Sequence, residues 1–376
     1  MTTNLADLLA DVDRVARDTI APGAARIDAQ SEFPRAAIDA LAGVGALGVL
    51  SSPDVGGLGL GLSAAAEVVQ RVAQACGSTA MVLTMHLCGT AVLEAFAPVA
   101  VRRDAASGKH LSTLAFSEAG SRSMFWAPTS TATRTADGIA LDAKKSWVTS
   151  AHHATAYVWS SRPIAGDGPS TLWLVPRDAA GVAVAAGFDG LGLRGNDSCP
   201  VTATKAVVPE SAMLGSDGGG FDVMMGVVLP NFQVLNAACS LGLMNAAIAR
   251  TIAHATGTKF EHTGAALADS PVTRGHISRM KLMTDQVATL VADTTAALAQ
   301  GRADASLRVL QTKAAAGETA NAVLDLAMRV CGGAAFRKEV GVDRYFRDAR
   351  ASAVMAPTLD ALHEFMGRAL CGMPLA

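Results

Sequence analysis

Aromatic residues make up only 5% of this 376-residue chain, and charged residues only 17%. The charges are nearly balanced, with a net charge of −2, and they are mixed along the sequence. No basic stripe of the kind that binds nucleic acid is present, so nucleic acid is not an expected partner. Half of the residues are hydrophobic, with Ala and Gly frequent, which favours helices packed closely through short side chains.

Long apolar runs and closely spaced cysteines are also lacking. No run reaches the roughly 18–20 apolar residues that span a bilayer. The first 18 residues carry four Asp and no basic stretch, which predicts an amphipathic helix rather than a signal peptide, and hence a cytoplasmic protein. No two of the six cysteines have CxxC spacing. His152 and His153 are expected on opposite faces of a strand without a third ligand, so we predict no metal site.

Three zones differ in residue pattern, and a chain of this length exceeds the roughly 250–300 residues of a single core. Residues 1–112 show helical periodicity and predict an N-terminal α-helical domain. Residues 113–222 hold all four tryptophans and predict a middle β-barrel or sandwich domain. Residues 223–376 return to helical periodicity and predict a C-terminal helical bundle.

Local signals place several elements within these zones. Two strand-like stretches flank Asp137-Gly138, which predicts a hairpin. Further strands are expected at 156–160, 171–175 and 203–208. In the last zone, 234–253 is apolar on nearly all faces and predicts a buried helix. Another long helix is expected from Ser306 to Val330, ended by Gly332-Gly333.

Motifs spread over nearly the whole chain resemble those of the acyl-CoA dehydrogenase superfamily. In order, they are Gly45–Gly48 with Pro53–Gly59, Leu114–Gly120, Lys145–Ser150, Cys331–Phe336 and Tyr345–Arg350. The resemblance implies an α+β, mostly α fold: an N-terminal helical domain, a small antiparallel β domain and a C-terminal four-helix bundle. It also implies FAD as the cofactor.

The resemblance carries over to candidate cofactor-binding residues. Phe116 and Ser117 match the V-T-E-P-G segment that holds the flavin ring, since the ring edge needs a donor and an acceptor. Trp147 and Thr149 match the ring contacts of K-x-W-I-T-N. The other positions matched to FAD contacts of the family are Ser123, Arg329, Gly332, Gly333 and Thr358.

The usual catalytic base is missing from the pattern. Dehydrogenation needs a carboxylate that removes the α-proton of the acyl thioester. Ala356 occupies the commonest family position of this carboxylate, and Phe232 occupies the alternative one. The family arginine that reaches the FAD pyrophosphate across a subunit interface is replaced by Phe260, with Lys259 beside it as a point charge.

Three functions therefore stay open. The first is α,β-desaturation of an acyl-CoA or acyl-carrier thioester, with a relocated base such as Asp360, His363 or Glu364. The second is a flavin-dependent monooxygenase or oxidase of the same fold. The third is a non-catalytic subunit of a heteromeric enzyme. The resemblance implies a homodimer or homotetramer, or a heteromer, and an electron-transfer flavoprotein or a flavin reductase as redox partner.

Overall fold

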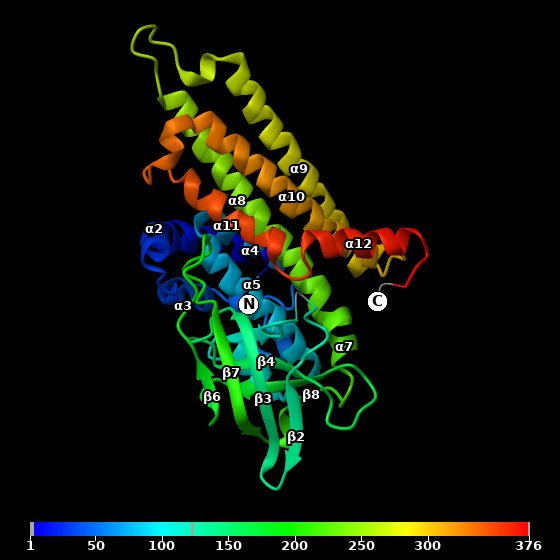
Figure 1. Ribbon diagram of the computed structural model, residues 1–376. Helices are drawn as coiled ribbons and strands as arrows, with labels where there is room; N and C mark the ends of the chain where they lie inside the picture. The colour runs from blue at the N-terminus through cyan, green and yellow to red at the C-terminus, as the bar shows by residue number, and fades with distance from the viewer. Residues whose placement is uncertain (1–3, 122–123, 375–376) are drawn as a thin grey trace.

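The computed structural model describes residues 4–121 and 124–374, and it follows the helix, strand, helix order of the sequence (Figure 1). The first six helices are α1 (Leu5–Val15), α2 (Ala21–Gln30), α3 (Arg35–Gly43), α4 (Gly61–Ala75), α5 (Gly77–Phe96) and α6 (Val99–Ala106). Asn4 caps the N-terminus of helix α1, and its side chain accepts a hydrogen bond from Asp7 N at 3.0 Å. Its apolar stripe faces the core, as the periodicity predicts.

The strands form two four-stranded sheets packed face to face. One sheet has the order β1-β4-β5-β8, from Ser112–Ala115, Ala156–Ser161, Thr171–Pro176 and Met213–Leu214. The other has the order β2-β3-β7-β6, from Thr131–Thr135, Gly138–Val148, Cys199–Val208 and Val182–Val184. The expected hairpin is β2–β3, and its turn falls at Asp137-Gly138. Tyr157, Trp159 and Trp173 are fully buried between the sheets.

Two details differ from the sequence-based expectation. Strand β1 pairs with β4 in parallel, so the domain is not purely antiparallel. The parallel pairing is possible because the long segment between these strands includes the whole β2–β3 hairpin. His152 and His153 lie in the turn between β3 and β4 rather than on a strand.

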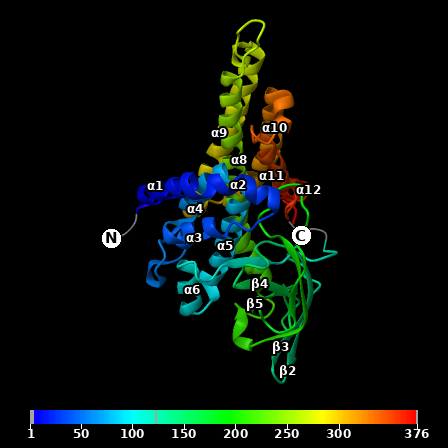
Figure 2. The ribbon, with the colours of Figure 1, turned by 90° about the vertical axis from the view of Figure 1, so that its left-hand side faces the viewer.

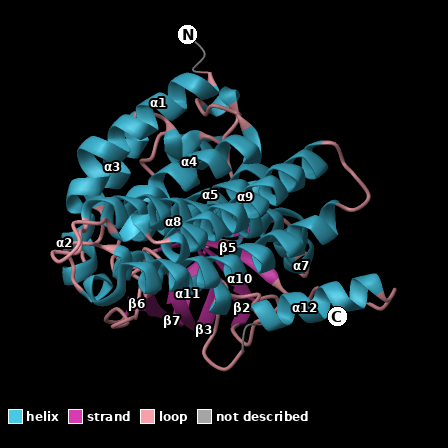
Figure 3. Ribbon diagram, turned by 90° about the horizontal axis from the view of Figure 1, so that it is seen from above, coloured by secondary structure: helices cyan, strands magenta, loops and turns pink. Residues whose placement is uncertain are grey.

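The C-terminal helices pack beside and above the sheets (Figures 2 and 3). They are α7 (Gly220–Val223), α8 (Leu229–Gly257), α9 (Pro271–Ala299), α10 (Ala305–Cys331), α11 (Val342–Val354) and α12 (Leu359–Leu370). Helix α8 lies against α4 so closely that a Cβ at Gly242 would be 2.3 Å from Gln70 O. Helix α10 ends at Gly332, which has φ 55°, as the Gly-Gly stop signal predicts.

Two helical segments are long and apolar enough to cross a membrane by length and composition. They are Gly77–Phe96 and Gly220–Gly257, so the expectation that no segment reaches this length is wrong. In each segment, 72% of the most apolar window is buried inside the protein. The cause of their apolar character is therefore core packing, and they give only weak evidence for a membrane.

Candidate functional site

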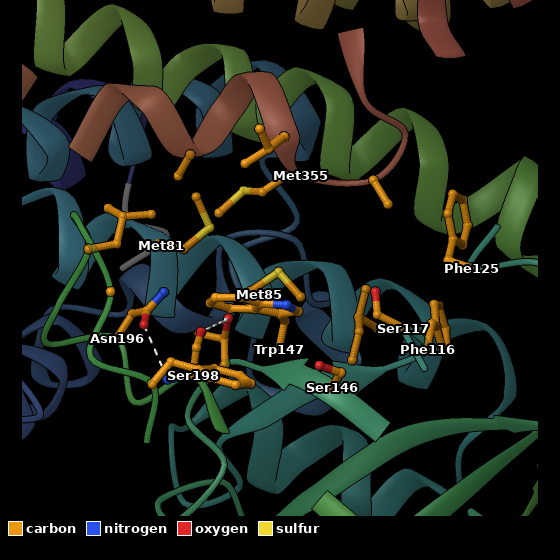
Figure 4. A pocket seen from close by; sticks show the side chains of 18 of the residues that line it. Met81, Met85, Phe116, Ser117, Phe125, Ser146, Trp147, Asn196, Ser198 and Met355 are labelled. Atoms are coloured by element: carbon orange, nitrogen blue, oxygen red, sulfur yellow. Dashed lines mark hydrogen bonds between the residues drawn. The ribbon is translucent and has the colours of Figure 1, made fainter. Parts of the chain in front are cut away.

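A cavity of about 870 Å³ lies between the β domain and helices α5, α8 and α11. Figure 4 shows Phe116, Ser117, Ser146 and Trp147 on its strand side and Met355 on its helical side. Its walls are mainly apolar, with a few hydroxyl and amide groups. This combination is typical of a small-molecule or cofactor site.

Phe116 and Ser117 reach the cavity because they directly follow β1. Ser117 O accepts a hydrogen bond from Ser146 N at 2.9 Å, and Glu118 pairs with Lys145 in an isolated antiparallel bridge. These contacts join the end of β1 to the end of β3. The two candidate flavin motifs, almost 30 residues apart in sequence, therefore line one wall.

Trp147 projects from an irregular point of β3. The register against β7 shifts between Lys145 and Val148, and Trp147 has φ 57°, a left-handed conformation that is costly for a bulky residue. Its ring stacks on Phe188 with a centroid distance of 4.0 Å, yet Trp147 remains 60% exposed. A large aromatic surface is thus presented to the cavity at the cost of local strain.

Thr149 follows Trp147 at the end of β3 and is buried. Its Oγ1 lies 3.4 Å from Ser198 Oγ, and both residues line the cavity. The structure therefore brings together Phe116, Ser117, Trp147 and Thr149, the four residues that the sequence motifs assign to the flavin ring.

A buried ion pair anchors this wall. Lys145 Nζ lies 2.6 Å from Glu118 Oε1 and 2.7 Å from Ser160 O. Burial would raise the pKa of Glu118, but the Lys145 charge and hydrogen bonds from Ser130 and Thr129 outweigh it and lower this pKa to about 2. Glu118 contacts the cavity, but its carboxylate is fully engaged and is a poor proton acceptor.

Ala356 and Phe232, the two positions predicted for the catalytic base, both line the cavity and carry no proton acceptor. Besides Glu118, the cavity carboxylates among the described residues are Asp189 and Asp197. Asp189 is 2.6 Å from Arg194, and Asp197 accepts hydrogen bonds from His152. Within residues 4–121 and 124–374, each carboxylate that lines the cavity is therefore already paired.

A buried lysine, which the sequence analysis did not identify, holds the turn that carries Ala356. Lys313 Nζ donates to Met355 O at 2.9 Å and to Pro357 O at 2.6 Å. Burial lowers the pKa of Lys313 to about 7. The two hydrogen bonds fix the backbone on both sides of Ala356, the predicted position of the base.

The other candidates after this turn do not line the cavity. Thr358 is the N-cap of α12, and its Oγ1 accepts from Ala361 N at 3.3 Å. On α12, Asp360 is exposed, His363 lies 2.8 Å from Glu318, and Glu364 lies 2.7 Å from Arg368. The expectation that one of these three residues supplies a relocated base is not supported by their placement within this chain.

The candidate pyrophosphate contacts also lie away from the cavity. Arg329, Gly332 and Gly333 are exposed at the end of α10, and Lys259 and Phe260 are exposed in the loop after α8. The family resemblance assigns these residues to FAD bound by a neighbouring subunit. They are therefore not expected at the flavin wall of their own chain. Ser123 lies outside the described residues.

Arg347 and Asp348 do not pair with one another. Arg347 binds Asp28, with Nη1 2.8 Å from Oδ1, and so joins α11 to α2. Asp348 is buried and accepts a hydrogen bond from Leu193 N at 2.6 Å. Burial raises the pKa of Asp348 to about 6.

His152 lies close to two other side chains that can bind metals, which the sequence analysis did not anticipate. Its Nδ1 lies 2.8 Å from Asp197 Oδ1 and 3.5 Å from Cys199 Sγ. Asp197 and Cys199 both place ligand atoms near His152, so the expectation that a third ligand is absent is wrong. The absence of a metal stays a prediction.

The fold and the cavity are those of a flavoprotein oxidoreductase. Family profiles match residues 2–105, 113–206 and 218–370, as the N-terminal, middle and C-terminal domains of acyl-CoA dehydrogenase. The chain belongs to the acyl-CoA dehydrogenase family.

Individual proteins agree with this assignment. The human mitochondrial short-chain specific acyl-CoA dehydrogenase is 26% identical over 347 residues, which cover 90% of this chain and 82% of that protein. The solved butyryl-CoA dehydrogenase of Megasphaera elsdenii superposes with a TM-score of 0.91 at 20% identity, covering 99% of this chain and all of the other. A structure described as PigA with FAD and proline superposes with a TM-score of 0.90 at 20% identity, covering 99% and 98%.

FAD is the cofactor of this family, and the cavity fits a flavin. Its volume accommodates a flat tricyclic ring, and Trp147 offers an exposed aromatic surface against which such a ring can lie. Phe116, Ser117 and Thr149 supply backbone groups and hydroxyls on the same wall.

Proposed function

We propose that this chain oxidises an acyl thioester at its Cα–Cβ bond, with FAD held against the wall formed by Phe116, Ser117, Trp147 and Thr149. The observation that supports this is one cavity that joins this wall to Phe232 on α8 and Ala356 after α11. An acyl chain lying between the wall and the helices would place its α- and β-carbons near the flavin wall on one side and near Phe232 and Ala356 on the other. FAD, when bound, supplies the acceptor for the β-hydrogen as a hydride.

The side chains of this chain mainly bind and orient in this reaction. The wall is rigid because the Lys145–Glu118 pair is buried beneath it. Met81, Met85 and Met355 give the helical side an apolar surface. Because no unpaired carboxylate of the described residues lines the cavity, the α-proton leaves to solvent, and desaturation is slow with an unactivated acyl group.

A second function, a flavin-dependent oxidase or monooxygenase, is favoured by the same shortage of unpaired carboxylates. Oxygen chemistry at reduced flavin needs no carboxylate in the cavity. A third, a non-catalytic subunit, is favoured by the joint replacement of the base by Ala356 and of the pyrophosphate arginine by Phe260. A related partner chain would supply both groups.

One preparation of the purified chain tests these functions. Bleaching of the flavin colour by butyryl-CoA without oxygen supports desaturation. Bleaching only by a flavin reductase, followed by substrate-dependent oxygen uptake, supports the second function. A colourless protein that takes up FAD only with a partner chain supports the third and contradicts the proposal.

We further propose a cytoplasmic homodimer or homotetramer that passes electrons to an electron-transfer flavoprotein. The exposure of Arg329, Gly332 and Gly333 supports a site completed by a neighbouring subunit. Light scattering with and without FAD measures the assembly, and a monomer that binds FAD fully would contradict it.

A further inference from the structure

Three side chains of metal-binding type meet at the turn between β3 and β4. His152 Nδ1 lies 2.8 Å from Asp197 Oδ1 and 3.5 Å from Cys199 Sγ, and Cys199 Sγ lies 3.3 Å from Asp197 Oδ1. Within residues 4–121 and 124–374, this is the one group of at least three His, Cys, Asp or Glu side chains whose ligand atoms lie within 4.8 Å of one another. The sequence-based prediction of no metal assumed that a third ligand is absent, and the folded chain supplies that ligand.

The three separations are close to those that a tetrahedral zinc ion requires. Zinc bonds of about 2.0–2.3 Å at tetrahedral angles place sulfur about 3.5 Å from nitrogen and from oxygen, and nitrogen about 3.3 Å from oxygen. The two distances to Cys199 Sγ, 3.5 and 3.3 Å, therefore need little change. The separation of His152 Nδ1 and Asp197 Oδ1 must widen by about 0.5 Å. His152 is exposed, so its ring has room for this shift.

Backbone contacts hold the three ligands in place. Ala151 N donates to Asp197 O at 3.1 Å, which joins the turn after β3 to the segment before β7. Asp197 Oδ2 accepts a hydrogen bond from His152 N at 2.7 Å, and this bond orients the carboxylate. Cys199 begins β7 and pairs with Val148 of β3. Such outer contacts favour metal binding because the ligands are already oriented.

The donor atoms select the kind of metal. Imidazole nitrogen and thiolate sulfur favour zinc and the later transition metals, whereas Mg²⁺ and Ca²⁺ prefer oxygen ligands. Binding releases the thiol proton of Cys199 to solvent, and the resulting thiolate and the Asp197 carboxylate balance the charge of a divalent ion. The adjacent His153 points elsewhere, since its ring stacks on Phe33 with a centroid distance of 4.0 Å.

We propose that His152 Nδ1, Asp197 Oδ1 and Cys199 Sγ bind one zinc ion, with water as the fourth ligand. Water reaches the site because the side chain of His152 is 44% exposed. The ion ties the turn after β3 to the start of β7. Ser198, between two of the ligands, lines the cavity with its Oγ 3.4 Å from Thr149 Oγ1, so the ion also fixes this end of the wall. The proposal goes beyond the proposed function and needs neither flavin nor thioester.

Equilibrium dialysis of the purified full chain against Zn²⁺, after treatment with a chelator, tests the proposal. Bound zinc is measured by atomic absorption, and one zinc ion per chain is expected. His152→Gln and Cys199→Ala are each expected to weaken binding by at least about a hundredfold, because the loss of even an outer partner of a metal ligand costs about 10–100-fold. His153→Gln is the matched control: it removes the neighbouring imidazole, which lies outside the site, and should leave zinc binding unchanged.

X-ray absorption of the zinc-loaded natural chain identifies the ligands without any substitution. One sulfur is expected at about 2.3 Å from zinc, and it should be missing in Cys199→Ala. The proposal is overturned if the natural chain binds no zinc, if His153→Gln weakens binding as much as His152→Gln, or if no sulfur is bonded to the zinc.

Discussion

Replacing Ala356 with glutamate is expected to create acyl-CoA dehydrogenase activity well above that of the natural chain. Ala356 lines the cavity, and Lys313 fixes the carbonyls of the residues on either side. The new side chain therefore starts from a defined backbone position. The cavity around it has mainly apolar walls, so burial raises the pKa of the new carboxyl and makes it a better proton acceptor.

A positioned general base accelerates proton transfer by about 10²–10⁴-fold, which corresponds to about 2.7–5.4 kcal/mol of activation free energy. The assay is flavin reduction by butyryl-CoA in anaerobic stopped flow, followed against pH. Ala356→Gln has the same size without the base, and Ala369→Glu places the same charge on the exposed side of α12. The reasoning is refuted if Ala356→Glu retains FAD but reduces it no faster than Ala356→Gln.

Three further predictions concern the scaffold of the site. Glu118→Gln leaves the buried Lys145 charge unpaired and is expected to lower the free energy of unfolding by about 3–5 kcal/mol in urea titration. The exposed pair Arg17–Asp18 is the control, and Asp18→Asn should change nothing measurable, so equal effects would contradict the argument. Asp348 has a raised pKa in the folded state, so its contribution to stability is complete below its unfolded pKa of about 3.8 and is lost as the pH rises through about 6. Asp348→Asn should therefore be more stable than the natural chain at pH 7.5, by up to about 3 kcal/mol, with a difference that disappears toward pH 4; a pH-independent difference would refute it. Trp147→Ala should weaken FAD binding about tenfold, and Trp147→Phe by less, in titrations of the apoprotein with FAD; unchanged affinity in both would exclude Trp147 from the flavin wall.

Features encoded by neighbouring residues could be predicted from the sequence. The β2–β3 hairpin follows from Asp137-Gly138, and the end of α10 follows from Gly332-Gly333, because turn and stop signals act over a few residues. The gathering of Ser117 and Trp147 in one wall was anticipated only through the family motifs.

Features that depend on long-range contacts could not be predicted. Lys313 reaches the turn at Ala356 from another helix, and Arg347 finds Asp28 rather than its neighbour Asp348. Thr358 has a second role that its motif did not suggest, because a threonine before an amphipathic segment is also an N-cap signal, and its side chain caps α12. Its contact with the cofactor stays a prediction. The sequence carried no signal for the parallel pairing of β1 with β4, because the periodicity of a strand does not encode which other strand it pairs with.

Because Trp147 is exposed to the cavity, the tryptophan fluorescence of the protein reports whether the cavity is occupied. All four tryptophans are among the described residues: Trp159 and Trp173 are fully buried, Trp126 is half-buried, and Trp147 faces the cavity. A ring stacked on Trp147 quenches the emission of that indole, so the tryptophan emission of the protein falls as the cavity fills. The fraction of loaded protein can therefore be read from unlabelled samples, in competition with any ligand that enters the same cavity.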